Sequence, residues 1–365
     1  MNNTNPLLNI PEYLTYDDVL LLPNYSEVRP SQTQVQTQLT DQIRLDIPIV
    51  ASPMDTVCEA EMAIALGELG GLGIIHRNLS IADQVQQVER VLKAKITVAA
   101  AVGVGSDFNE RTEALVKTGI KILCIDSAHG HTKHVIEATK LIKIKYPKIE
   151  LLSGNVATYE GAKALFAAGA DAVKVGMGPG SICTTRVMSG IGVPQLTAVV
   201  EGVRAAREFK KYVIADGGIR TSGDIVKALA AGASTVMLGS LLAGTDEAPG
   251  EVVQMGDKLY KTYRGMGSVA AMKHGSATRY GQKWEKGKTK ELVPEGVEGL
   301  VAHKGPLADH IHQLIGGARA GMGYLGAKTI SELHQKAKFI KITNASLIES
   351  HPHNLVITNP GKNYV

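Results

Sequence analysis

Eight short apolar runs recur between residues 47 and 238, and amphipathic segments separate most of them. The runs are 47–51, 72–75, 97–102, 121–125, 150–153, 172–175, 212–215 and 235–238. Helical periodicity occurs between them over 59–69, 108–117, 135–145, 159–168, 199–209 and 222–230. Alternating short strands and helices predict a parallel sheet, and eight such units predict an α/β fold of the closed (β/α)₈ barrel type. An open, doubly wound sheet is the alternative, but no G-x-G-x-x-G motif opens a helix after the first run.

The segments outside this repeat predict an arm and a flap. Residues 1–46 look irregular, apart from a short strand at 18–22. Residues 247–306 follow the eighth run, are rich in Gly, Lys and Met, and show weak periodicity before a final barrel helix near 307–314. A loop of that length in a compact domain is typical of a functional lid. We therefore expect one catalytic barrel domain over 1–365, with a mobile flap inserted after its eighth strand.

Polar or glycine residues follow seven of the eight predicted strands. They are Ser52–Asp55, His76 and Arg77, Asp126–His129, Gly154 and Asn155, the loop around Cys183, Asp216–Gly218, and Gly239 with Ser240. The carboxyl ends of barrel strands meet at one face, which carries the active site. The glycines after the last two strands can bind a phosphate through backbone N–H groups. A turn explains any one of these motifs, but seven on one face predict a site.

The loop Gly176-Met-Gly-Pro-Gly-Ser-Ile-Cys-Thr-Thr-Arg186 is the most distinctive of these segments. Its glycines allow φ > 0 and close approach to a ligand, and Pro179 stiffens the turn. Cys183 stands at its tip, where a thiolate could react with a substrate. A glycine-rich turn with an incidental cysteine is the alternative for this loop taken alone.

The composition is that of an ordinary globular protein. Hydrophobic residues make up 44% of the 365 residues and charged residues 20%, which suits a sizeable core. Three cysteines without framework spacing and an N-terminus without a signal-peptide pattern predict reduced thiols and a cytoplasmic protein. No apolar run reaches the roughly 18 residues of a membrane span. The net charge of +4 comes without an aromatic-interleaved basic stripe, so we expect no nucleic-acid partner.

Eight motifs, taken in order, resemble the inosine-5′-monophosphate (IMP) dehydrogenase family in its bacterial form. They are ASPMDTV (51–57), GLGIIHRN (71–78), DSAHGH (126–131), GMGPGSICTTR (176–186), ADGGIR (215–220), YRGMGS (263–268), PEG (294–296) and ESHPH (349–353). The resemblance implies a (β/α)₈ enzyme that oxidises IMP to xanthosine monophosphate (XMP) with NAD, for guanine nucleotide synthesis. Family members usually carry a pair of CBS regulatory domains after the second barrel helix. Here the chain passes from 91–95 straight to the third predicted strand, so we expect that module to be absent near 91–96.

The resemblance implies a covalent mechanism. Cys183 would add to C2 of the purine, so that the C2 hydrogen can leave as hydride. Arg279 and Tyr280 of the flap would then enter the vacated nicotinamide site and activate the water that hydrolyses the intermediate. Thr185 would help to handle the proton of that water.

The resemblance also assigns binding roles. The implied substrate contacts are Ser52, Met54, Ser181, Asp216, Gly218, Gly239, Ser240, Tyr263, Gly265, Met266, Gly267 and Glu295. Among them, Asp216 would accept the ribose hydroxyls and Glu295 would contact the purine edge. The implied cofactor contacts are Asp126, Ser127, Ala128, Asn155 and Gly176, with Gly323 and Tyr324 of a neighbouring subunit.

A monovalent cation, normally K⁺, is also implied. Backbone carbonyls of Gly178, Gly180 and Cys183 would supply one side of its site. Glu349, Ser350 and His351 of the next subunit would supply the other, which implies a homotetramer. The remaining cysteines, Cys58 and Cys124, we expect to be buried and inert.

Two alternative functions stay open at this point. GMP reductase resembles this chain in its barrel, its cysteine loop and its phosphate site. The pair Arg279-Tyr280 in a long flap and the pair Asp126-Ser127 favour the dehydrogenase. A non-catalytic purine-nucleotide-binding protein is the other alternative, and it would need none of Cys183, Thr185 and Arg279.

Overall fold

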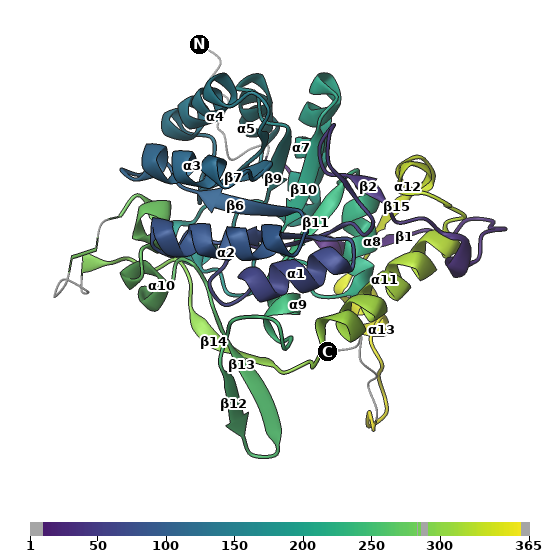
Figure 1. Ribbon diagram of the computed structural model, residues 1–365. Coiled ribbons are helices and arrows are strands. Elements are labelled where there is room, and N and C mark those ends of the chain that lie inside the picture. Colours follow the sequence, from purple (N-terminus) through teal and green to yellow (C-terminus); the bar gives the residue numbers. More distant parts are fainter. Residues whose placement is uncertain (1–9, 283, 286–290, 359–365) are drawn as a thin grey trace, which may run out of the picture.

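A closed barrel of eight parallel strands forms the centre of the protein (Figure 1). The computed structural model describes residues 10–282, 284–285 and 291–358. The barrel strands are β4 (Ile49–Ala51), β5 (Leu72–Ile75), β6 (Val98–Val102), β7 (Ile122–Asp126), β8 (Glu150–Val156), β9 (Ala172–Val175), β10 (Tyr212–Asp216) and β11 (Thr235–Leu238). Their order, β10-β11-β4-β5-β6-β7-β8-β9, closes by pairing β9 with β10. The predicted barrel is confirmed, and each predicted run contains one of these strands or overlaps it.

Helices surround the barrel on its outer side. They are α1 (Ala60–Glu68), α2 (Ile81–Lys93), α3 (Phe108–Lys117), α4 (Lys133–Lys145), α5 (Tyr159–Ala167), α7 (Gln195–Phe209), α8 (Ser222–Ala230) and α11 (Leu307–Tyr324). Several begin at a Ser or Thr whose side chain accepts a backbone N–H of the first turn, as Ser80 and Thr221 do. The last helix is longer than predicted: it continues past Leu314 to Tyr324 although glycines disfavour a helix, and it buries Ala318 and Met322 there.

Strand alternation decides which polar groups reach the inside of the barrel. Apolar side chains such as Leu72, Ile122 and Ile214 fill its interior. Because side chains alternate along a strand, Asp126, Lys174 and Asp216 point the same way as the interior residues of their own strands. These three charged groups therefore lie together at the carboxyl end of the barrel, where a site is expected.

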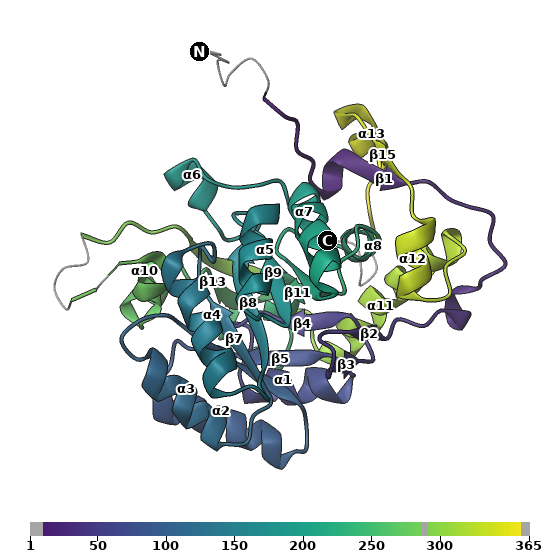
Figure 2. The ribbon, with the colours of Figure 1, turned by 90° about the horizontal axis from the view of Figure 1, so that it is seen from above.

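The N-terminal arm packs against the C-terminal elements (Figure 2). Strand β1 (Val19–Leu21), within the predicted 18–22, pairs antiparallel with β15 (Phe339–Lys341). The short elements η1 (Tyr16–Asp18) and η2 (Pro30–Gln32), the hairpin of β2 (Thr37–Gln38) and β3 (Arg44–Leu45), and helices α12 (Ile330–Lys336) and α13 (Asn344–Glu349) complete this part. The arm thereby reaches the barrel rim with Tyr16 buried.

The segment after β11 is more regular than predicted. Strands β12 (Val252–Met255), β13 (Lys258–Arg264) and β14 (Glu298–Ala302) form an antiparallel sheet that projects from the barrel (Figure 1). Short helices α9 (Ser240–Ala243) and α10 (Val269–Lys273) and the 3₁₀ turn η3 (Ser276–Tyr280) accompany it. The sheet is largely exposed, so its apolar alternation is incomplete. The usable signal was the hairpin turn Gly256-Asp257, where Gly256 has φ +60°.

Helix α2 ends at Lys93 and β6 begins at Val98. Residues 94–97 alone connect them, which leaves no space there for an inserted regulatory domain. Among the residues that the structure describes, none of the helices has the length and hydropathy needed to cross a bilayer.

Candidate active site

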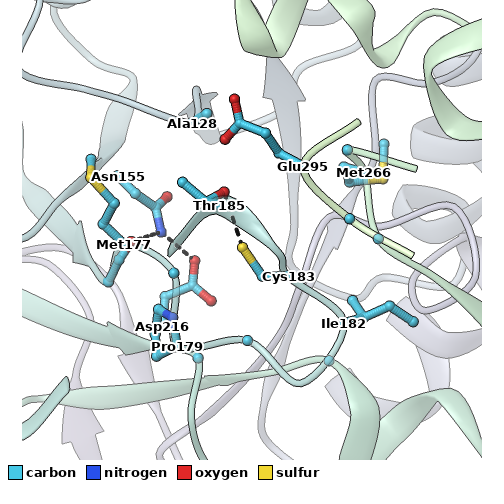
Figure 3. Close-up of a pocket in the computed structure, with 18 of the residues that line it drawn as sticks. Ala128, Asn155, Met177, Pro179, Ile182, Cys183, Thr185, Asp216, Met266 and Glu295 are labelled. Carbon is cyan, nitrogen blue, oxygen red and sulfur yellow. Dashed lines mark hydrogen bonds between the residues drawn. The ribbon is translucent and has the colours of Figure 1, made fainter. Parts of the chain in front are cut away.

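A cavity of about 890 Å³ opens at the carboxyl ends of the barrel strands (Figure 3). That is the size of a site for a large ligand. The predicted residues that line it are Ser52, Met54, Asp126, Ser127, Ala128, Asn155, Gly176, Gly178, Gly180, Ser181, Cys183, Thr185, Asp216, Gly218, Gly239, Ser240, Tyr263, Gly265, Met266, Gly267, Arg279, Tyr280 and Glu295. Residues more than 200 positions apart thus meet around one space.

Five predicted residues lie elsewhere on this chain. Tyr324 is 72% exposed at the end of α11, after Gly323, and neither lines the cavity. Glu349, Ser350 and His351 are exposed at the end of α13. All five are expected to act in a neighbouring subunit, so their roles stay predictions.

The cysteine loop is held in place from two sides. Gly176 has φ +155°, and a Cβ there would lie 1.9 Å from the carbonyl oxygen of Asp216, so only glycine fits. On the other side, the amide of Thr184 donates to the carbonyl of Glu295 at 2.9 Å. Cys183 lies between them at the loop tip, just before the short helix α6 (Thr185–Ser189). Its Sγ lies 3.2 Å from Oγ1 of Thr185 (Figure 3).

Two carboxylates share one buried lysine beneath this loop. Nζ of Lys174 donates to Asp126 at 2.6 Å and lies 4.0 Å from Asp216. Nδ2 of Asn155 donates to Asp216 at 2.7 Å and to the carbonyl of Gly176 at 3.0 Å. The carboxylates are therefore held in fixed orientations. Sequence reasoning missed Lys174, whose signal was a charged residue at an inward position of the apolar run 172–175.

The segment predicted to be a flap lies against the cavity, with Arg279 and Tyr280 in its lining. Arg279 forms an ion pair with Asp126, and the amide of Ala128 donates to the Arg279 carbonyl at 3.4 Å. Burial raises the pKa of Tyr280, although the charge of Arg279 acts against that shift. The flap thus occupies the part of the cavity where the predicted cofactor residues Asp126 and Ala128 lie.

Another part of the cavity wall, formed by Gly217, Gly218 and Tyr263, offers hydrogen-bond donors. Gly217 and Gly218 have φ of +96° and +77° and pack against Pro179. Burial raises the pKa of Tyr263 to about 12, so its hydroxyl keeps its proton at neutral pH. This part of the wall can therefore offer backbone N–H groups and a neutral hydroxyl to an anion.

Some lining residues were not predicted. Tyr16 and Asp17 come from the irregular arm, whose sequence carries no motif. His134 and Arg220 stand at the rim, and Arg220 forms an ion pair with Asp17. The ion pair ties the arm to the site, and only the folded chain brings its two members together.

A family model described as "IMP dehydrogenase / GMP reductase domain" matches residues 13–353. The inosine-5′-monophosphate dehydrogenase of Borreliella burgdorferi is 46% identical over 394 residues, covering 94% of this chain and 97% of that protein. This chain belongs to the IMP dehydrogenase family. The IMP dehydrogenase of Aquifex aeolicus is 42% identical, over 97% of this chain and 98% of its own. That of Rhodopirellula baltica is 43% identical, over 96% and 88%.

The alignments also show that IMP dehydrogenases differ in length. The alignment with the Aquifex relative extends over 484 residues, more than the 365 of this chain, so that IMP dehydrogenase holds residues that this chain lacks. The alignment with the Borreliella relative extends over only 394. Shorter and longer relatives therefore both cover nearly all of this barrel.

Proposed function

We propose that this protein oxidises IMP to XMP with NAD, in guanine nucleotide biosynthesis, through a covalent intermediate on Cys183. The observation that carries the proposal is that Cys183 lines the cavity, with its Sγ 3.2 Å from Oγ1 of Thr185. The similarity of this chain to the IMP dehydrogenases of two bacteria supports the same activity.

The first half of the reaction belongs to the cysteine loop. The sulfur of Cys183 forms a bond to C2 of the purine, which makes C2 tetrahedral. C2 then loses its hydrogen with two electrons, leaving a thioimidate on Cys183. NAD⁺, when bound, supplies the hydride acceptor. Asp126 and Asn155 are proposed to orient it, and both lie in fixed hydrogen bonds at the cavity wall.

The second half belongs to the flap. Asp126 is a proposed cofactor contact and is also the ion-pair partner of Arg279. The flap and the nicotinamide therefore use the same place in turn, and hydrolysis follows release of NADH. Arg279, with Tyr280 and Thr185, then takes the proton of the water that attacks C2. The bond between C2 and the sulfur breaks, which releases XMP and restores Cys183.

Substrate contacts divide by chemistry. Asp216 accepts the ribose hydroxyls, and Glu295 accepts the purine N1–H, which adenine does not offer. The remaining proposed contacts are Ser52, Met54, Ser181, Gly218, Gly239, Ser240, Tyr263, Gly265, Met266 and Gly267. Of these, Ser181, Gly218, Gly239, Ser240 and Tyr263 form the phosphate site.

The cysteine loop also fits a K⁺ ion. Within the described residues, the carbonyls of Gly178 and Cys183 accept no backbone hydrogen bond, while that of Gly180 accepts only the amide of Cys183, at 3.1 Å. Carbonyl oxygens are suitable ligands for this large, hard cation. We propose that Glu349, Ser350 and His351 of a neighbouring subunit complete the site in a homotetramer, which light scattering would measure.

K⁺ is expected to activate the enzyme and Na⁺ to be a poor substitute, because the loop carbonyls suit the larger ion. Steady-state rates in KCl, NaCl and a cation-free buffer of equal ionic strength measure this. Equal rates in all three would contradict the proposal. Removal of the chain from Glu349 onward should abolish the K⁺ effect, because half of the ligands are lost.

Fluorescence of Trp284 is expected to report movement of the flap. This residue is the single Trp of the chain, and it packs on the flap cluster of Met272, Ala277 and Leu292. A cofactor analogue added to enzyme holding an XMP-like ligand should change its emission, because the analogue displaces the flap. The same addition to Trp284→Phe gives the background. An unchanged spectrum with an analogue proven to bind would mean that this segment does not move.

Absorbance at the reduced-nicotinamide band tests the function itself. An increase on mixing protein, IMP and NAD supports the dehydrogenase. Oxidation of NADPH in the presence of GMP would instead support GMP reductase, to which the matching family model also refers. No absorbance change in either assay would support a protein that binds nucleotides without catalysis.

A further inference from the structure

The loop after β5 lines a small cavity together with Arg279. Nη1 of Arg77 donates to Oγ1 of Thr278 at 3.2 Å, one residue before Arg279. A Cβ placed on Gly103, which follows β6, would lie 2.8 Å from the Arg77 guanidinium. Arg77 is thus fitted between the end of β6 and the flap. Burial and the neighbouring charge of Arg279 lower the pKa of Arg77 to about 10, so it stays charged at neutral pH.

A small cavity separates this loop from Arg279. Its volume of about 10 Å³ suits one water molecule, and Asn78, Asp126, Ser276 and Arg279 are among its lining residues. Two of its walls carry buried polar atoms without a protein partner, namely Oδ1 of Asn78 and Nε of Arg279. The first is an acceptor and the second a donor, which is what one bridging water requires.

The orientation of Asn78 is fixed by its other contacts. Nδ2 of Asn78 donates to a carboxylate oxygen of Asp55 at 2.6 Å, so Oδ1 must face the other way. There it meets the flap, since a Cβ on Gly275 would lie 3.1 Å from Oδ1. Asn78 is 91% buried, as its exposed fraction of 9% shows. A buried acceptor without a hydrogen-bond partner is unfavourable, which favours a resident water at this site.

We propose that Arg77 and Asn78 are positioning residues for Arg279: Arg77 holds the flap through Thr278, and Asn78 holds the Arg279 side chain through one buried water. The proposal rests on the proposed role of Arg279 in hydrolysis. Neither residue touches the substrate. Both act only when the flap is docked, so they affect the second half of the reaction and leave hydride transfer alone.

The kinetic test uses four variants. Arg77→Met removes the bond to Thr278, and Gly103→Ala displaces the Arg77 side chain without changing that residue. Asn78→Ala removes the acceptor for the water. Arg77→Lys keeps the positive charge but lacks the planar guanidinium group. The first three should release one NADH per site in a normal burst. They should then turn over roughly 10- to 100-fold more slowly, in scale with a misplaced catalytic group. Arg77→Lys should lie between Arg77→Met and the parent.

A matched control separates positioning from damage to the fold. Arg90→Met removes an arginine of α2 that is exposed and pairs with Glu61, and it should leave the rates unchanged. Mass spectrometry of denatured protein should find the purine adduct in Arg77→Met and Asn78→Ala, and little of it in Arg90→Met. Loss of the burst together with turnover would overturn the proposal, because it would place these residues in folding or binding.

A crystal structure of the flap-docked enzyme at high resolution tests the water directly. A water within hydrogen-bond distance of both Asn78 Oδ1 and Arg279 Nε is expected, and a dry cavity would overturn the role of Asn78. The two proposals fail separately. If Arg77→Met, Gly103→Ala and Asn78→Ala turn over normally while Arg279→Ala stalls, only the positioning proposal is overturned. If Arg279→Ala accumulates no stalled adduct, the proposed role of Arg279 in hydrolysis is overturned.

Discussion

Cys183→Ala is expected to form no NADH at all. Without the sulfur, C2 of the purine stays planar and its hydrogen cannot leave as hydride. The loss should be roughly 10⁴-fold or more, in scale with removal of a catalytic nucleophile. Stopped-flow absorbance measures the burst and the steady state together, and both should be missing while IMP still binds.

The other cysteines provide the control. Cys58 is fully buried, and burial raises the pKa of its thiol, so it is neither accessible nor ionised. Cys58→Ala should therefore keep its activity. A thiol reagent should modify Cys183 first, and IMP should protect it. Substantial NADH formation by Cys183→Ala would refute the covalent mechanism.

Arg279→Ala is expected to separate the two half-reactions. Hydride transfer needs Cys183 and not the flap, so about one NADH per site should appear in a fast burst. Turnover should then fall roughly 10²- to 10⁴-fold, in scale with loss of a positioned base. The stalled enzyme should carry the purine as a mass increase that survives denaturation.

The opposite result has a clear meaning. If Arg279→Ala loses the burst in proportion to turnover, Arg279 serves hydride transfer or binding, and the flap does not bring the base. Arg90→Ala is the matched control, because that arginine is exposed on α2, pairs with Glu61 and does not line the cavity. It should show normal burst and turnover.

The sequence predicts the barrel well because each strand is short, apolar and local in its signal. Runs such as 72–75 and 235–238 need only their own residues to be recognised, and both are strands with unchanged bounds. The projecting sheet was not foreseen, because β13 pairs with β14 across more than 30 residues and most side chains of β12 and β14 face solvent. Pairing of that kind depends on contacts that no local pattern encodes.

The same contrast between local and long-range signals holds for the candidate site. Motifs after seven of the strands predicted residues that line the cavity, but not which of them touch one another. The ion pair of Arg279 with Asp126 joins groups 153 positions apart. Lys174 was missed because a lysine inside an apolar run was treated as part of a strand. Its role is visible only beside the two carboxylates that it serves.

Backbone hydrogen bonds join the two ends of the flap segment to each other. The amide of Gly265 donates to the carbonyl of Val297, and the amide of Glu295 donates to that of Gly267, each at 3.0 Å. The segment between Gly267 and Glu295 is therefore a closed loop, whose end-to-end entropy is lost on folding and not in each catalytic cycle. Doubling the length of such a loop costs only about 0.6 kcal/mol, so its outer part can vary in length between relatives. Arg279 can leave the cavity while Glu295, the proposed purine contact, stays at the joined base of the loop.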